Sequence, residues 1–316
     1  MNFQSMEYFV ALARERSFTG AARCLHMTQQ SLSAHIAGME RELGCQLVIR
    51  NVPLELTYAG EVMLRYAKSF CRDKEEMLQE FCDISGNQKG VLKIGISPTR
   101  GRVIMPTIIR AFQESFPNIH IELAEAPNDM LFDKLLNRET DLIIANNIPG
   151  TVQDIDIRAF YSEEIVLLIP RELLKRVYGD ASAGILKQLR KGDFTTLSGF
   201  PFVVRSEEDI SGRIGHYFLE KFRIERPVIR IFSAYIETLL SACSLGIGAC
   251  FCGERIARAV LTPDQFSSLH VFHLGEEAKY GMYFGYRKGG YQWSVKKAFM
   301  DIASSPDVLA SFSGNT

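Results

Sequence analysis

The segment from Ser17 to Gly44 constrains the fold more than any other part of the chain. Ser17 and Thr28 are favourable helix N-caps, and each precedes a short stretch with helical spacing of apolar residues. His26 and Met27 separate the two stretches, and Gly44 can end the second helix in a left-handed conformation. Two short helices joined by a tight turn, the second beginning with small polar residues, are typical of a helix-turn-helix.

The flanking segments complete a small domain around this motif. Phe3, Met6 and Phe9 share one face of a predicted first helix. Residues 46–50 and 54–57 form two short β-like runs about a proline turn, which predicts the hairpin of a winged helix. We therefore expect a winged helix-turn-helix DNA-binding domain over residues 1–60.

A single long helix is predicted from Tyr58 to about Ile84, followed by a flexible linker. At about 27 residues it would be about 40 Å long. Its apolar residues form a heptad-like stripe that is interrupted at Asp73 and Lys74. The simplest partner for such a stripe is the same helix of a second chain. We expect a dimerisation helix over residues 61–89, with contacts from Met63, Phe70, Met77 and Phe81.

Strand-like and helical segments alternate through the rest of the chain, which predicts an α/β fold with mostly parallel sheets. This part is long enough for two βαβ subdomains with a cleft between them. We expect it to cover residues 90–316, with one subdomain formed by approximately 90–161 and 267–316 and the other by 162–266. The apolar runs behind this prediction are 91–96, 119–123, 142–145, 165–169, 202–204, 228–232, 247–251 and 283–286.

Composition excludes several other classes of protein. Hydrophobic residues make up 47% of the chain and charged residues 23%, which is typical of globular proteins and excludes a disordered or fibrous chain. The net charge of −1 gives no overall basic field for nucleic acid. No apolar stretch approaches the length of a membrane span, and residues 1–7 do not resemble a signal peptide. We therefore expect a cytoplasmic protein with no membrane partner.

Catalytic and metal sites are not indicated. The chain has no G-x-S-x-G, H-E-x-x-H or P-loop pattern, and its six histidines form no ligand-like cluster. Cys250 and Cys252, with Cys243 upstream, invite a metal or redox interpretation, but zinc would need more ligands at short spacing. In a reducing compartment the seven scattered cysteines are better explained as small buried residues. We expect neither an enzyme nor a bound metal.

The helix-turn-helix segment resembles the N-terminal motif of LysR-type transcriptional regulators. Residues 17–47 read SFTGAARCLHMTQQSLSAHIAGMERELGCQL, against a family pattern S-F-[ST]-x-A-A-x-x-L-[HN]-[VM]-[ST]-Q-x-[AS]-[LV]-[ST]-x-x-I-x-x-L-E-x-x-L-G. Further matches are Leu56-Thr57-x-Ala59-Gly60, Gly90-x-Leu92-x-Ile94-Gly95, Phe116-Pro117 and Asp141-Leu142. The resemblance covers essentially the whole chain and weakens after about residue 200.

The resemblance implies that the second helix of the motif enters the major groove of DNA, where its N-terminal residues meet base edges. Glutamine can pair with adenine through two hydrogen bonds, and serine and threonine reach bases or phosphates. We expect DNA contacts from Ser17, Thr28, Gln29, Gln30, Ser31, Ser33, His35 and Arg50. The alternative is that these polar residues only cap and solvate the helices.

Two departures from the family pattern bear on DNA affinity. Gln30 replaces the proline that is frequent at that position, so base specificity is expected to differ. The wing lacks the usual basic residues, and Arg50 is the only one in the hairpin. Residues 1–60 contain five arginines against five glutamates, a net charge of zero. Non-specific attraction to DNA phosphates should therefore be weak, and affinity for DNA would depend on two or more of these domains binding together.

The α/β part resembles the family's effector domain, which is similar to periplasmic binding proteins. Ligands in such folds lie in the crevice beyond the carboxyl ends of strands. The candidate effector contacts are Ser97, Pro98, Thr99, Arg100, Asn128, Asn146, Arg205 and Gly248. With Arg100 beside the first loop and Arg205 in the other subdomain, we expect an anionic effector. In the alternative, the hydroxyls only cap a helix and both arginines point to solvent.

The resemblance implies a regulator that binds double-stranded DNA as a homodimer or homotetramer and responds to a small molecule. It implies no cofactor beyond that unidentified effector, and RNA polymerase is a further candidate partner. A rival hypothesis from another class is a cytoplasmic α/β small-molecule binder or enzyme whose N-terminal helices serve only for dimerisation. The rival predicts no DNA affinity for the first ninety residues.

Overall fold

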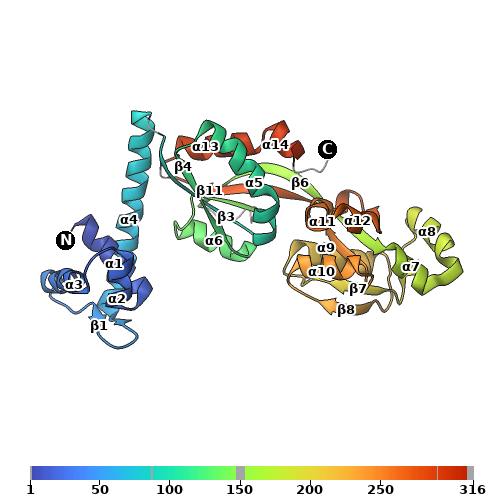
Figure 1. Cartoon of the computed structure of the whole chain (residues 1–316), viewed down its shortest axis with the longest axis horizontal. Coiled ribbons are helices and arrows are strands. Elements are labelled where there is room, and N and C mark those ends of the chain that lie inside the picture. Colours follow the sequence, from blue (N-terminus) through green and yellow to red (C-terminus); the bar gives the residue numbers. More distant parts are fainter. Residues whose placement is uncertain (1, 87, 147–153, 290, 312–316) are drawn as a thin grey trace. The chain divides into compact units, whose positions relative to one another are not determined.

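The computed structural model describes residues 2–86, 88–146, 154–289 and 291–311. The chain divides into two compact units, Met1–Gln88 and Lys89–Thr316 (Figure 1). Within the described ranges, no helix combines the length and apolar character needed to cross a bilayer.

Three helices form the head of the first unit, and their caps are the residues that the sequence indicates. Helix α1 spans Phe3–Glu15, α2 spans Phe18–Cys24 and α3 spans Gln29–Leu43. The Ser17 side chain accepts a hydrogen bond from the Gly20 N–H, and Thr28 accepts one from the Ser31 N–H. Gly44 ends α3 with a φ of 70°. The prediction of a helix-turn-helix is confirmed.

A two-stranded wing follows α3 and is anchored to it. Strand β1 (Val48–Ile49) pairs antiparallel with β2 (Glu55–Leu56). The Glu40 carboxylate accepts hydrogen bonds from the backbone N–H groups of Leu47 at 2.8 Å and Val48 at 3.3 Å. A Cβ atom at Gly60 would lie 2.0 Å from the Leu47 carbonyl oxygen, so only glycine allows the next helix to pass this close to the wing.

Helix α4 spans Tyr58–Ser85, close to the predicted range. Met63, expected on the pairing surface, is instead buried in the core of its own head, where it packs with residues such as Phe9 and Leu12. At the interruption of the stripe, the Lys74 ammonium pairs with Glu7 of α1, with 2.6 Å between Nζ and Oε1. The exposed apolar residues on that side of α4 begin at Tyr66 and include Phe70, Met77, Phe81 and Ile84.

The first lobe of the second unit is built on three parallel strands. Strand β3 (Gly90–Ile96) lies between β4 (Ile119–Glu125) and β5 (Leu142–Asn146). Alternate strand residues face two cores. Ile94 and Ile144 pack with helices α5 (Pro98–Ser115), α13 (Ser294–Ala303) and α14 (Pro306–Ser311), whereas Ile143 packs with α6 (Asn128–Leu136). The helices therefore cover both faces of the sheet (Figure 1).

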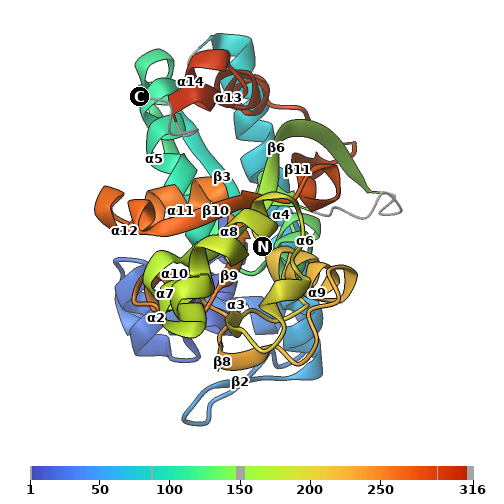
Figure 2. The same ribbon diagram turned by 90° about the vertical axis from the view of Figure 1, so that its right-hand side faces the viewer.

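Helices also pack against the strands of the second lobe (Figure 2). Strand β7 (Pro201–Val204) pairs parallel with β8 (Val228–Phe232). Strands β9 (Cys250–Gly253) and β10 (Leu269–His273) pair antiparallel with the second half of β6 (Ile155–Pro170). The helices of this lobe are α7 (Arg171–Tyr178), α8 (Ser182–Arg190), α9 (Ile210–Lys221), α10 (Ile236–Ser244), α11 (Glu254–Val260) and α12 (Pro263–Ser267).

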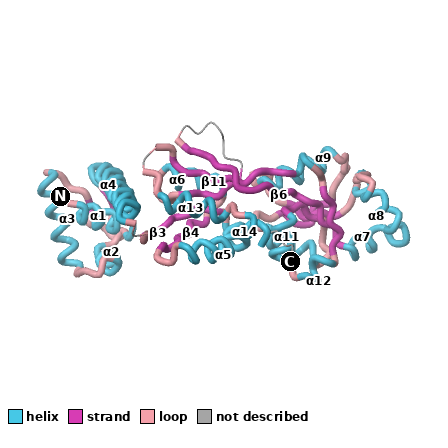
Figure 3. Tube along the Cα trace, turned by 90° about the horizontal axis from the view of Figure 1, so that it is seen from above, coloured by secondary structure: helices cyan, strands magenta, loops and turns pink. Residues whose placement is uncertain are grey.

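Two long strands run between the lobes: β6 (Ile155–Pro170) and β11 (Lys279–Arg287) (Figure 3). They pair antiparallel with each other, and β11 also pairs antiparallel with β5. The expectation of mostly parallel sheets is therefore wrong, because the crossing strands pass in opposite directions. The second crossing also comes later than residue 266, since Leu269, Phe272 and Ala278 pack in the cores of the second lobe.

Candidate functional site

The first turn of α3 presents polar side chains to solvent. Gln29, Gln30 and Ser31 are exposed, and neither glutamine amide contacts another polar group of the described residues. Thr28 is also exposed, but its side-chain oxygen is occupied as the N-cap. The two amides are therefore free to bind a partner outside the unit, and each offers one acceptor and two donor hydrogens.

The other predicted DNA contacts lie around this turn with partners of their own. Arg50 donates from Nη1 to the Ser33 Oγ at 3.2 Å, and its guanidinium lies 5.2 Å from the centroid of the Phe18 ring. The His35 ring is exposed and stands edge-on to Tyr8 at 5.0 Å. Ser17 caps α2. The contact with Ser33 holds Arg50 beside α3, at the base of the wing.

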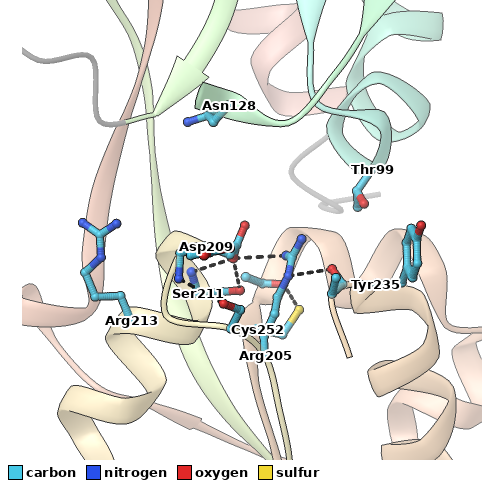
Figure 4. Close-up of polar contacts among 12 residues, drawn as sticks. Thr99, Asn128, Arg205, Asp209, Ser211, Arg213, Tyr235 and Cys252 are labelled. Carbon is cyan, nitrogen blue, oxygen red and sulfur yellow. Dashed lines mark hydrogen bonds and ion pairs between the residues drawn. The ribbon is translucent and has the colours of Figure 1, made fainter. Parts of the chain in front are cut away.

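In the second unit, the hydroxyl of Thr99 reaches across from the first lobe to the second (Figure 4). It donates to Oε1 of Glu237, at the start of α10, over 3.0 Å, and Arg102 contacts the same oxygen at 3.3 Å. Ser97 is the N-cap residue of α5 but makes no side-chain capping bond. Neither hydroxyl therefore caps α5. Glu237 gives no signal in the sequence, because a glutamate in a first helical turn is ordinary.

Arg205 extends from the end of β7 toward the same region (Figure 4). Its Nε donates to the Ala234 carbonyl at 3.0 Å, and its Nη1 lies 3.1 Å from Oδ1 of Asp209. Asp209 is the N-cap of α9 and accepts from the Ser211 N–H at 2.9 Å. Because the side chain of Arg205 keeps 22% of its surface exposed, the guanidinium is oriented by these contacts and can still meet a ligand.

The two asparagines expected at the site are brought together. The Asn128 amide donates to the Asn146 carbonyl oxygen at 2.8 Å and also contacts the Asn146 side-chain oxygen. Asn128 begins α6 without a side-chain cap, and Asn146 is buried at the end of β5. Asn147, the next residue after this strand, lies outside the described residues. Asn128 and Thr99 lie on the part of the first lobe that faces Arg205, but the Asn128 amide bonds to Asn146 of its own lobe (Figure 4).

Arg100 is not placed to meet an effector. It is only 7% exposed, its Nη2 pairs with Oε2 of Glu163 at 3.2 Å, and it contacts the Tyr280 hydroxyl at 2.5 Å. Burial alone would lower the pKa of Arg100, but Tyr280 and Glu163 outweigh it and hold the pKa well above its ordinary value. For the Tyr280 hydroxyl, whose charged form is an anion, burial raises the pKa. The guanidinium is thus occupied within the protein and does not point to solvent.

Gly248 has a role in packing the backbone and does not supply a ligand contact. A Cβ atom there would lie 2.8 Å from the Phe202 carbonyl carbon. Its lack of a side chain lets the 246–249 segment approach β7, where Ala249 bridges to Phe202. Pro98, at the start of α5, lines a cavity of about 500 Å³. The other residues that line this cavity are Gly101, Arg102, Met105, Pro106, Ile109, Leu123, Glu125 and Glu237.

The cysteines of the second lobe are buried in its core. Burial raises the pKa of Cys243 and Cys252 well above the ordinary value, and that of Cys250 to about 12. They are therefore protonated thiols at neutral pH, a form that neither binds metals nor attacks oxidants readily. Within the part of the chain that the structure describes, no three histidine, cysteine or acidic side chains are grouped to hold a metal ion.

Both units of the chain match known protein families. The model of bacterial regulatory helix-turn-helix proteins of the lysR family matches residues 3–61, and that of the LysR substrate binding domain matches residues 85–305. One relative is a probable RuBisCO transcriptional regulator of Porphyra purpurea, 30% identical over 76% of this chain and 74% of the relative. Another is the uncharacterized HTH-type transcriptional regulator YcgK of Bacillus subtilis, 24% identical over 96% and 94%.

Similar solved structures share the fold at low sequence identity. A full-length variant of OxyR from Pseudomonas aeruginosa is 20% identical, with a TM-score of 0.66 over 97% of this chain and 96% of that one. Full-length CbnR, solved with its target DNA, is also 20% identical, with a TM-score of 0.61 over 96% and 98%.

Proposed function

The chain belongs to the LysR family of bacterial helix-turn-helix regulators, and from that premise we propose which of its residues meet DNA and which meet the effector. It is a DNA-binding transcriptional regulator with a domain for a small-molecule effector, in a family of regulators rather than enzymes. The match of residues 3–61 to a DNA-binding family contradicts the rival hypothesis that the N-terminal helices serve only for dimerisation.

The observation that carries the DNA proposal is the free first turn of α3. Gln29 and Gln30 are exposed there and have no partner among the described residues, which leaves them available to read bases. Thr28, Ser31 and the N-terminal N–H groups of α3 are suited to phosphates. Around them, we assign backbone contacts to Ser17, Ser33, His35 and Arg50.

Replacing Gln29 by alanine tests this assignment. We expect Gln29→Ala to weaken binding to the cognate site by about 1–3 kcal/mol and to change binding to random DNA much less. The measurement is a gel shift with the DNA that flanks the chain's own gene, compared with scrambled DNA. Gln4→Ala, the same change at an exposed glutamine of α1, is the control and should bind normally. Equal losses on both DNAs would show that Gln29 does not read bases.

For the effector, we propose a ligand with an anionic group that binds between the two lobes of the second unit. Thr99 already donates to the carboxylate of Glu237, so an incoming carboxylate could take that place with similar geometry. The helix α5 begins here without a side-chain cap, which leaves backbone N–H groups available to an anion. Arg205 would supply the positive charge from the second lobe, and Ser97, Asn128 and Asn146 further hydrogen bonds.

Substitution of the two hydroxyls separates a ligand contact from a structural role. We expect Ser97→Ala and Thr99→Ala to retain DNA binding and to lose the effector-dependent change in transcription, because their hydroxyls do not cap α5. Thr107→Ala, within the same helix, is the control and should respond normally. A thermal-shift screen against metabolites supplies the effector, and reporter transcription measures the response. A full response combined with a lower melting temperature would assign these hydroxyls to stability instead.

The assembly follows from the exposed stripe of α4. We propose that two such helices pair and place two heads on the half-sites of an imperfect palindrome. If the second units of the chains also pair, separately from the α4 helices, the assembly is a tetramer. Effector binding would then shift an equilibrium between two arrangements of the DNA-binding heads. Contact with RNA polymerase would then convert the rearrangement into altered transcription in the cytoplasm.

A further inference from the structure

The second lobe contains a cavity that is separate from the region between the lobes. It has a volume of about 380 Å³ and is lined by residues of α7, α8, α12 and β10. Small-molecule pockets usually have volumes of about 300–1,000 Å³. The lining residues are Arg171, Arg190, Phe266, Ser267, Leu269, His270, Val271 and Phe272. None of them belongs to the proposed effector site.

Two arginines of this cavity have no counter-charge. No described carboxylate forms an ion pair with Arg171 or Arg190, and no acidic side chain lines the cavity. Arg171, Arg190 and His270 line the same cavity. Burial lowers the pKa of His270, and the charges of the two arginines lower it further. Two guanidiniums without counter-charges at one cavity repel each other, and an anion bound between them would offset this electrostatic repulsion.

The surroundings strengthen the positive potential. Residues 171–191, which form α7 and α8, carry six basic residues and two acidic ones. The hydroxyl of Ser267 already donates to the Asp264 carbonyl at 2.9 Å, so the arginines are the principal donors available to a ligand. Phe266, Val271 and Phe272 supply an apolar wall beside them. Guanidinium groups next to an apolar surface are suited to a small molecule that carries an oxyanion.

We propose that this cavity is a second ligand site of the regulator, which binds a small oxyanion-bearing molecule, a phosphate or a carboxylate, between Arg171 and Arg190. Arg171 directly follows the last residue of β6, the strand that runs between the lobes, and its N–H donates to the Ser268 carbonyl at 3.0 Å. A ligand held by Arg171 would therefore be bound by the residue that directly follows that strand. This site is independent of the proposed effector site, and either could exist without the other.

Calorimetric titration of the full chain with inorganic phosphate, and separately with succinate, tests the proposal at constant ionic strength. We expect one of the two anions to bind, and Arg171→Gln and Arg190→Gln each to weaken that binding about tenfold or more. Lys187→Gln removes the same charge from α8 outside the cavity lining and should bind normally. Melting temperatures of the variants show that they are folded.

A variant in the region between the lobes identifies which site is titrated. Arg205→Gln should leave the affinity for the anion unchanged if the cavity is the binding site. The proposal is overturned if neither anion binds the native chain, if Lys187→Gln weakens binding as much as Arg190→Gln does, or if only Arg205→Gln abolishes it. The last result would also support the proposed effector site, so the two proposals can fail separately.

Discussion

The double variant Phe70→Asp, Phe81→Asp is expected to lose self-association and, with it, about 10²–10⁴-fold of its affinity for the cognate DNA. Phe70 and Phe81 are 46% and 59% exposed in the single chain, so a partner helix would bury much of each ring. Each buried aromatic side chain contributes about 1.5–3 kcal/mol, and a carboxylate in its place would have to be desolvated. Because the head has no net charge, a single head should bind DNA weakly.

Lys68→Asp is the matched control, since it changes the net charge by the same two units at an exposed position on the opposite side of α4. Light scattering measures the mass of both variants, and a gel shift measures their DNA affinity. We expect the control to keep the native mass and the double variant to give monomers or insoluble chain. A soluble double variant with unchanged mass would show that the stripe does not drive pairing.

The head can be predicted from its sequence because its signals are local. Ser17, Thr28 and Gly44 set helix ends within three residues of themselves, and the structure places each at the expected cap. Met63 is the exception. Its heptad spacing fits a pairing stripe, but spacing alone does not show how far along α4 its own head covers the helix.

The lobes of the second unit are less predictable, since the missing information is long-range. Most strands coincide with apolar runs, but the direction of pairing depends on where β6 and β11 cross between the lobes. No predicted apolar run coincides with strand β10. The predicted end of the second lobe, at residue 266, therefore comes too early in the sequence. In its sequence, Leu269-His270-Val271-Phe272-His273, polar residues interrupt the apolar ones, which weakens the signal of a buried strand.

The same limit applies to the effector site. Arg100 follows a strand and begins a helix, which is where ligand contacts occur in such folds. Its actual partners, Glu163 and Tyr280, are 63 and 180 positions away in the sequence, and no local pattern identifies them. Thr99 is paired with Glu237 across 138 positions. Residue type and position at a strand end therefore locate the region, whereas distant partners decide which side chains remain free.

The buried pair of Arg100 and Glu163 leads to the other large expected effect. The two side chains are only 9% and 3% exposed, and the Tyr280 hydroxyl contacts both. Arg100→Met should lower the free energy of unfolding of the second unit by about 3–5 kcal/mol, because it leaves the Glu163 carboxylate buried without its counter-charge. Denaturation followed by the fluorescence of Trp293 measures this, since the chain's one tryptophan lies in the core of the first lobe.

A second variant shows whether the loss comes from the uncompensated charge or from altered packing. Arg100→Met combined with Glu163→Gln removes both charges and leaves an amide that can still bond to Tyr280. If charge is the cause, this double variant should lose only about 1–3 kcal/mol, the cost of an imperfectly satisfied buried polar group. It would then be more stable than Arg100→Met alone, although it carries one more substitution. Losses that simply add would mean that the two residues act independently, and that the ion pair does not hold the crossing strand β6 to α5.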